Sequence, residues 1–96
     1  AGLGSATQDS YITCIGHNAT AVGTGSIAIG ASSDCNHSNA VALGYNTATV
    51  RADSVCVGAR DIELTDSGKG IILKSPDSTL YRVTVANGGT LTVTAV

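Results

Sequence analysis

Short apolar runs followed by a glycine recur at a constant spacing along the first half of the chain. Runs such as Ile27-Ala28-Ile29 precede glycines that stand fourteen residues apart. The series is Gly2, Gly16, Gly30, Gly44 and Gly58. A constant period is typical of repeat architectures. Fourteen residues are too few for a helical hairpin but enough for one turn of a parallel β-coil, so the pattern predicts an all-β solenoid over residues 1–59 with no helix.

The apolar runs also assign the two faces of the predicted strands, because successive strand residues point to opposite sides. The position two before each glycine is always small: Cys14, Ala28, Ala42 and Cys56. The position just before the glycine is β-branched or leucine: Ile15, Ile29, Leu43 and Val57. Neither face is charged, so we expect one to line the coil and the other to meet a second copy. The glycines at 16, 30, 44 and 58 are expected at sharp corners with positive φ.

The period stops near residue 59, and residues 60–96 follow a different pattern. Runs at 71–74, 80–85 and 90–96 read as strands, separated by turn residues around Pro76 and by Asn87-Gly88-Gly89, a hairpin signal. This segment is too small to be stable as isolated hairpins. It is therefore expected to form a small antiparallel β cap, which covers the open end of the coil or packs on its symmetry mates.

Composition and charge exclude several functions. Aromatic residues are limited to three tyrosines, and Phe, Trp and Met are absent, so the core must consist of thin repeated layers. Five basic against seven acidic residues give a net charge of −2 without a basic cluster, which argues against nucleic-acid binding. No apolar run approaches the length of about 18 residues that a membrane span needs. A small chain of such repeats is expected to self-associate.

The three cysteines are expected to remain thiols. Cys14 and Cys56 stand three turns apart, roughly 14 Å for strands spaced about 4.8 Å, which is too far for a disulfide. Cys35 occupies a different position, expected to face a corner. No Cys-x-x-Cys or His-x-x-x-His spacing indicates a zinc site. Free thiols indicate folding in a reducing cytoplasm.

Residues 21–30 read A-x-G-x-x-S-x-A-x-G, with variants before Gly44 and Gly58. This pattern resembles the head repeat of the YadA-like trimeric autotransporter adhesins, although Cys replaces the usual Ala at 14 and 56, and Ala40 replaces Ser. The resemblance covers about half of the chain, roughly residues 10–58. It implies left-handed parallel β-rolls, three chains side by side in an intertwined homotrimer.

The second half, from Gly70 through Tyr81-Arg82-Val83 to the threonine-rich end, is similar to the C-terminal ends of bacteriophage tail fibres and tailspikes. Those ends are trimeric and lie at the host-facing tip or cap the trimer. YadA-like repeats also occur in phage fibres, so the resemblances are compatible. They imply a C-terminal fibre fragment of the virion tail, folded in the host cytoplasm, that attaches to a cell-surface glycan or protein. The alternatives are the head of a bacterial surface adhesin and a trimerisation module without receptor contact.

Candidate chemistry is sparse. No Gly-x-Ser-x-Gly elbow or other catalytic constellation occurs, so we expect no enzyme and no cofactor. His17 and His37 could each meet their copies on a trimer axis and bind a metal, but corner roles are the better interpretation. The residue types that contact receptors are Tyr81, Arg82, Lys74 and Asp77. Tyr81 and Arg82 are adjacent and so face opposite sides of their strand.

Overall fold

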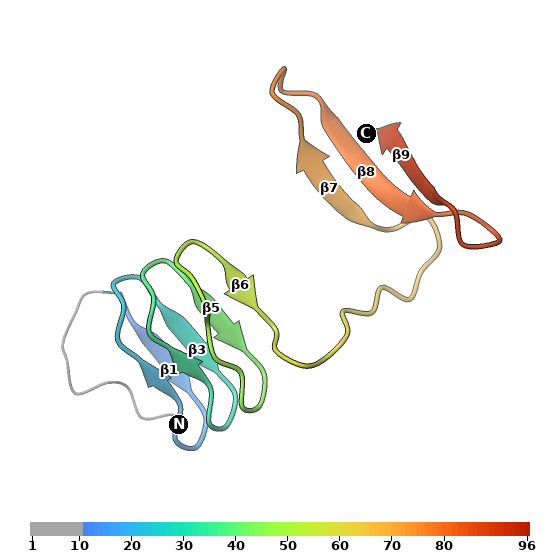
Figure 1. The fold of residues 1–96 in the computed structure, drawn as a ribbon. Helices are drawn as coiled ribbons and strands as arrows, with labels where there is room; N and C mark the ends of the chain where they lie inside the picture. The colour runs from blue at the N-terminus through green and yellow to red at the C-terminus, as the bar shows by residue number, and fades with distance from the viewer. Residues whose placement is uncertain (1–10) are drawn as a thin grey trace. The chain divides into compact units, whose positions relative to one another are not determined.

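A computed structural model describes residues 11–96 and contains nine β-strands and no helix over that range (Figure 1). The prediction of an all-β chain with parallel and antiparallel sheets is confirmed. The chain divides between Asp61 and Ile62 into two compact units. Gly2, the first glycine of the predicted register, lies outside the described residues.

The first unit is a parallel coil with a turn of fourteen residues. Its larger sheet has the order β1-β3-β5-β6, and its smaller sheet pairs β2 with β4. The register advances by fourteen, since Ala28 pairs with Cys14 on one side and with Ala42 on the other. The strand bounds are β1 Thr13–Ile15, β2 Thr20–Ala21, β3 Ile27–Ile29, β4 Asp34–Cys35, β5 Val41–Leu43 and β6 Val55–Cys56. An isolated bridge from Asp34 to Ala48 continues the smaller sheet.

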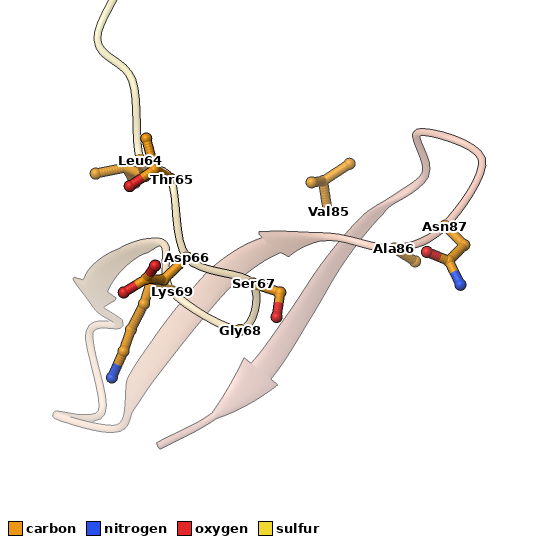
Figure 2. Close-up of a pocket in the computed structure, with 9 residues that line it drawn as sticks. All are labelled: Leu64, Thr65, Asp66, Ser67, Gly68, Lys69, Val85, Ala86 and Asn87. Carbon is orange, nitrogen blue, oxygen red and sulfur yellow. The ribbon is translucent and has the colours of Figure 1, made fainter.

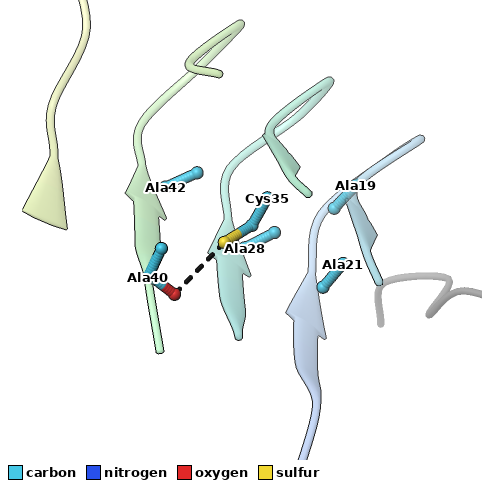
Figure 3. Packing of buried hydrophobic residues seen from close by; sticks show 6 residues of the cluster. All are labelled: Ala19, Ala21, Ala28, Cys35, Ala40 and Ala42. Atoms are coloured by element: carbon cyan, nitrogen blue, oxygen red, sulfur yellow. Dashed lines mark hydrogen bonds between the residues drawn. The ribbon is translucent and has the colours of Figure 1, made fainter. Parts of the chain in front are cut away.

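Small side chains fill the inside of the coil (Figure 3). The buried apolar residues are Ala19, Ala21, Ala28, Cys35, Ala40 and Ala42. The buried polar residues are Ser26, Ser33, Thr47 and Thr49. Over residues 11–96 no large apolar side chain is fully buried, so the core of the coil consists of thin layers of small side chains.

The position of Cys35 differs from the prediction. The sequence pattern placed it at a corner, but it lies in β4, is fully buried, and its thiol donates to the carbonyl of Ala40 at 3.1 Å. It occupies the inward position that Ala21 holds one turn earlier. A thiol fits there because cysteine is a small, weakly polar residue that is frequently buried.

Corner glycines are required for two reasons. Gly16, Gly30 and Gly44 have φ of +129°, +128° and +114°, as expected for corners that side chains rarely tolerate. In addition, a Cβ on Gly16 would lie 2.6 Å from the carbonyl of Gly30, and a Cβ on Gly30 equally close to that of Gly44. The glycines therefore allow adjacent turns of backbone to come into contact. Gly58 has a different φ of +72°, at the place where the period stops.

Two further left-handed positions repeat with the same period without requiring glycine. Residues at both positions lie next to corners. Several of them are Asn, Asp or Ser, whose short polar side chains help them to adopt this conformation. One series is Asn18, Ser32 and Asn46, and the other is Tyr11, Gly25, Asn39 and Asp53. Each turn of the coil thus contains three left-handed residues, of which only one is always glycine.

The second unit is one antiparallel sheet of order β7-β8-β9, with β7 Ile71–Lys74, β8 Leu80–Val85 and β9 Leu91–Ala95. These bounds confirm the three strands predicted for this half. The hairpin predicted at Asn87-Gly88-Gly89 is also confirmed, because the Ala86 amide donates to the Thr90 carbonyl at 2.8 Å and the Gly89 amide to the Ala86 carbonyl at 3.0 Å. No residue of the unit is buried in the single chain.

Candidate functional site

The outer face of the larger coil sheet is a stripe of exposed apolar side chains. The predicted small-residue face points into the coil: Ala28 and Ala42 are fully buried, and Cys14 and Cys56 are half-buried at the two ends. Burial raises the pKa of the Cys14 thiol, which keeps it protonated. The alternate positions point outward. Of these, Ile15 is 50 % exposed and Leu43 42 %, whereas Ile29 and Val57 are half-buried.

Arg60 closes the end of the coil. Its guanidinium donates to the Thr47 hydroxyl at 2.6 Å, to the Tyr45 carbonyl at 2.7 Å and to the Leu43 carbonyl at 3.3 Å, and it also bonds the Val57 carbonyl. It lies against Gly44, where the backbone of the next turn would otherwise lie. A planar group with five donors suits an edge that presents several carbonyls. Arg60 therefore donates hydrogen bonds to backbone carbonyls that the last turn of the coil would otherwise leave without a partner.

The second unit has one face without a single charged residue. Strand register and alternation assign residues to each face, because cross-strand partners point the same way. The apolar face consists of Ile71, Leu73, Tyr81, Val83, Val85, Leu91, Val93 and Ala95. Most of its side chains are open to solvent, since Leu91 is 72 % exposed and Val93 60 %, whereas Tyr81 and Val83 are half-buried. Such a contiguous apolar patch marks an interaction surface.

The opposite, polar face carries two of the predicted receptor residues. It consists of Ile72, Lys74, Leu80, Arg82, Thr84, Thr92 and Thr94. Lys74 pairs with Leu80, two residues from Arg82, so the two cations are diagonal neighbours, with no carboxylate on the face. Tyr81 lies on the apolar face instead. The structure therefore brings Lys74 and Arg82 together and separates both from Tyr81.

Asp77 lies in the turn between β7 and β8 and organises it. Its carboxylate accepts hydrogen bonds from the Ser75 hydroxyl and from the Thr79 amide, the latter at 3.0 Å. These bonds, the Ser75 one first, lower the pKa of Asp77 below its ordinary value of 3.8. An aspartate that bonds the backbone two residues on is a common turn device, so in the described structure this side chain stabilises the turn.

The histidines lie apart in the coil. His17 is an exposed residue that follows the corner Gly16, whereas His37 is half-buried and its Nδ1 lies 2.9 Å from the Thr49 hydroxyl. Over residues 11–96 no group of three or more His, Cys, Asp or Glu residues could hold a metal ion. The same part of the chain contains no helix of sufficient length and hydropathy to cross a membrane.

Two shallow pockets lie on the second unit. One, of about 360 Å³, lies between the loop at Leu64–Lys69 and the end of β8 at Val85–Asn87 (Figure 2). Its charged residues, Asp66 and Lys69, form no catalytic constellation. The other, of about 270 Å³, is lined by Ile62 and Leu64 together with Ile71, Val83, Val85 and Leu91 of the apolar face. Ile62 and Leu64 therefore extend the apolar face beyond the strands.

The fold and its surfaces define the class of protein. It is a parallel β-coil of short repeats with an apolar outer stripe, followed in the chain by a sheet with an uncovered apolar face. Residues 15–33 match the family described as the YadA head domain repeat, in two copies. The match spans the corner glycines Gly16 and Gly30 and the strands β2 and β3. It supports a YadA-like trimeric adhesin head. No curated protein matches the chain significantly.

The sequence pattern did not identify two elements of these surfaces. The sequence pattern assigned no role to Arg60, although its place two residues beyond the last glycine was a signal for an end cap. The apolar face was visible as alternation within each strand. Its full extent depends on the register that joins Ile71 to Val83 and Val83 to Val93.

Proposed function

We propose that this chain is part of a homotrimeric attachment protein that carries out no reaction. The observation that carries the proposal is the head-repeat match at residues 15–33, which lies on a coil whose larger sheet has an apolar, uncharged outer face. In the trimer the coil serves as a rigid spacer and a trimer core. The sheet unit caps the assembly and presents its polar face to a surface glycan or protein.

The head repeat fits two settings equally well, a phage tail fibre and a bacterial surface adhesin. We favour the phage fibre because Cys14, Cys35 and Cys56 are all thiols, and Cys35 is fully buried. Fibres fold in the cytosol, where thiols stay reduced, whereas exported adhesins cross an oxidising compartment. The similarity of the second half to fibre ends, described above, points the same way. The neighbouring genes would discriminate between the settings, since tail-assembly genes accompany a fibre.

Receptor contact is assigned to the polar face of the sheet, where Lys74 and Arg82 are diagonal neighbours and no carboxylate lies on the same face. Cations in this arrangement favour acidic groups such as those of bacterial surface glycans. Tyr81, which belongs to the apolar face, is assigned to packing instead. Asp77 contributes indirectly by holding the turn that follows Lys74.

Binding of the labelled 96-residue chain to two kinds of surface tests the proposal: bacteria that differ in surface glycans, and wells coated with matrix proteins. A fibre binds a subset of the bacteria, and an adhesin binds the wells. The double variant Lys74→Glu, Arg82→Glu is expected to lose binding, whereas Lys69→Glu, a charge reversal in the loop, retains it. An intact trimer that binds neither surface would contradict attachment and leave a trimerisation module.

A further inference from the structure

The hydrogen bonds at one corner of the coil repeat with the same period as the strands. In each turn two backbone amides, at the corner glycine and two residues later, donate to carbonyls of the turn before. The bonds run from Gly30 to Ile15 and from Gly44 to Ile29 at 2.7 Å, from Ser32 to His17 at 2.8 Å, and from Asn46 to Ala31 at 2.9 Å. Every turn that follows another therefore closes the corner of its predecessor with two donors.

A further turn would bring the amides of Gly58 and Arg60 to the carbonyls of Leu43 and Tyr45 in the same way. Neither of these bonds occurs in the described part of the chain, and Gly58 has φ of +72° instead of the +114° to +129° of the earlier corner glycines. The guanidinium of Arg60 donates to the same two carbonyls instead, at 3.3 Å to Leu43 and 2.7 Å to Tyr45. One side chain thus replaces both backbone donors of a turn that the coil does not make.

The guanidinium also lies where the backbone of that turn would lie. A Cβ on Gly30 would be 2.6 Å from the carbonyl of Gly44, the corner glycine of the following turn. A Cβ on Gly44 would instead meet Nη1 of Arg60 first. The same nitrogen donates to the hydroxyl of Thr47 at 2.6 Å, which fixes the group in this place. Arg60 therefore resembles the next turn in position as well as in hydrogen bonding.

The end of a parallel coil is an edge on which a second coil can add. An open edge presents backbone acceptors in the register of the next strand, and such edges promote association between chains. A second copy of this coil has turns of the same fourteen residues and the same pair of corner donors, so it fits the edge in register. With Arg60 in place the two corner carbonyls are occupied, and an added coil would have to desolvate a positive charge. Charged side chains on edges are a means by which proteins avoid this association.

We propose that Arg60 is a terminator of the coil: by replacing the donors of a further turn, it prevents a second copy of the chain from adding its coil to this end. The excluded partner is a copy of the coil, because no other surface of the described chain repeats donors at the spacing of these carbonyls. The inference concerns the end of the coil and not its outer face, so it goes beyond the proposed function.

Two arginines in the first unit allow a matched test. Arg60→Ala uncovers the two carbonyls and removes one charge. Arg51→Ala removes the same charge from an exposed position in the coil, where the side chain forms no hydrogen bond with the described residues. Arg60→Lys retains the charge at the edge, but a single ammonium cannot reproduce the planar fork that reaches both carbonyls.

The measurement is sedimentation velocity of the full chain over a series of concentrations, with amide exchange to show that the coil is folded. Arg51→Ala is expected to match the wild type at each concentration. Arg60→Ala is expected to shift to larger species as the concentration rises, with protected coil amides, and Arg60→Lys to lie between. Guanidinium chloride at about 20 mM, far below the molar concentrations that unfold proteins, should restore the wild-type sedimentation of Arg60→Ala, and an equal concentration of sodium chloride should not.

Three results would overturn the terminator. Arg60→Ala that sediments like the wild type at every concentration would leave Arg60 only a stabilising side chain. Larger species that lose protection of the coil amides, or that guanidinium leaves unchanged, would indicate aggregation of unfolded chains. Arg60→Lys identical to the wild type would show that charge alone protects the edge, and this comparison remains decisive if the alanine variant fails to fold. None of these results affects the proposed attachment function, which depends on the assembly and binding of the wild type.

Discussion

Replacing Gly30 with alanine probes the stacking of the coil turns most directly. Gly30 has φ of +128°, and a Cβ there would lie 2.6 Å from both the carbon and the oxygen of the Gly44 carbonyl. The neighbouring group is backbone within the sheet ladder, where the Gly44 amide donates to the Ile29 carbonyl at 2.7 Å, so it has little freedom to move away.

The expected loss of stability has two parts. A residue held in so sparsely populated a region of backbone space costs about 1–3 kcal/mol. Overlap with a packed neighbour costs about another 1–3 kcal/mol. Together they give about 2–6 kcal/mol, a large fraction of the 5–15 kcal/mol that typically separates a folded domain from its unfolded chain.

Gly25 supplies the matched control within the same coil. Its φ is +72°, and a Cβ there would meet only the flexible end of the Asn39 side chain, at 2.8 Å. Asn39 and Asp53 hold the same position in later turns, with φ of +54° and +57°. Gly25→Asn is therefore expected to cost less than about 1 kcal/mol, because Asn adopts this conformation readily.

Urea unfolding of the 96-residue chain, followed by circular dichroism at one fixed chain concentration, measures both changes. Gly30→Ala is expected to lower the midpoint clearly and Gly25→Asn hardly at all. Equal midpoints for the two variants would refute the argument that close approach of backbone requires glycine at the corners.

Three further predictions concern single side chains. Arg60→Ala removes the donors that close the coil and is expected to cost about 1–2 kcal/mol, visible as faster amide exchange in the last turn; an unchanged rate there would show that water serves equally well. Ser26 is fully buried and its hydroxyl has no hydrogen-bond partner among the described residues, whereas Ala40 fills the same position one turn later; Ser26→Ala is therefore expected to raise the free energy of unfolding by about 1 kcal/mol, and a clear loss in urea would count against it. The pKa of Asp77 is lower in the folded chain than its ordinary 3.8, so its contribution to the stability of the fold is fully present above that value and disappears as the pH falls through the lower folded pKa. A carboxyl titration followed by NMR should show the low midpoint, and Ser75→Ala should raise it. A wild-type midpoint at 3.8 or above contradicts the turn geometry.

Much of the coil could be predicted from the sequence because its interactions repeat locally. The fourteen-residue spacing determines that Ile27 pairs with Val41. Which of the two uncharged faces lines the coil stayed open in the sequence, and the structure shows that it is the small-residue face of Ala28 and Ala42. The left-handed positions at 18, 32 and 46 were not predicted, because Asn and Ser adopt other conformations equally well and only the closed corner selects this one.

The interaction surfaces were less accessible to sequence reasoning. Receptor residues were chosen by type. Alternation along the strand correctly placed Tyr81 and Arg82 on opposite faces, but only the register shows that Lys74 shares the face of Arg82. Turn lengths around Asp77 and Gly88 determine the register, and the register determines which side chains share a face. The Arg60 cap depends on carbonyls at Leu43 and Tyr45, distant in sequence and close only after the coil has formed.

The central claim is that this chain works as a homotrimer, and sedimentation equilibrium of the intact chain under reducing conditions tests it most directly. The account predicts a single species of three times the 9.5 kDa chain mass, stable on dilution. A stable monomer of 9.5 kDa with a folded coil would contradict it.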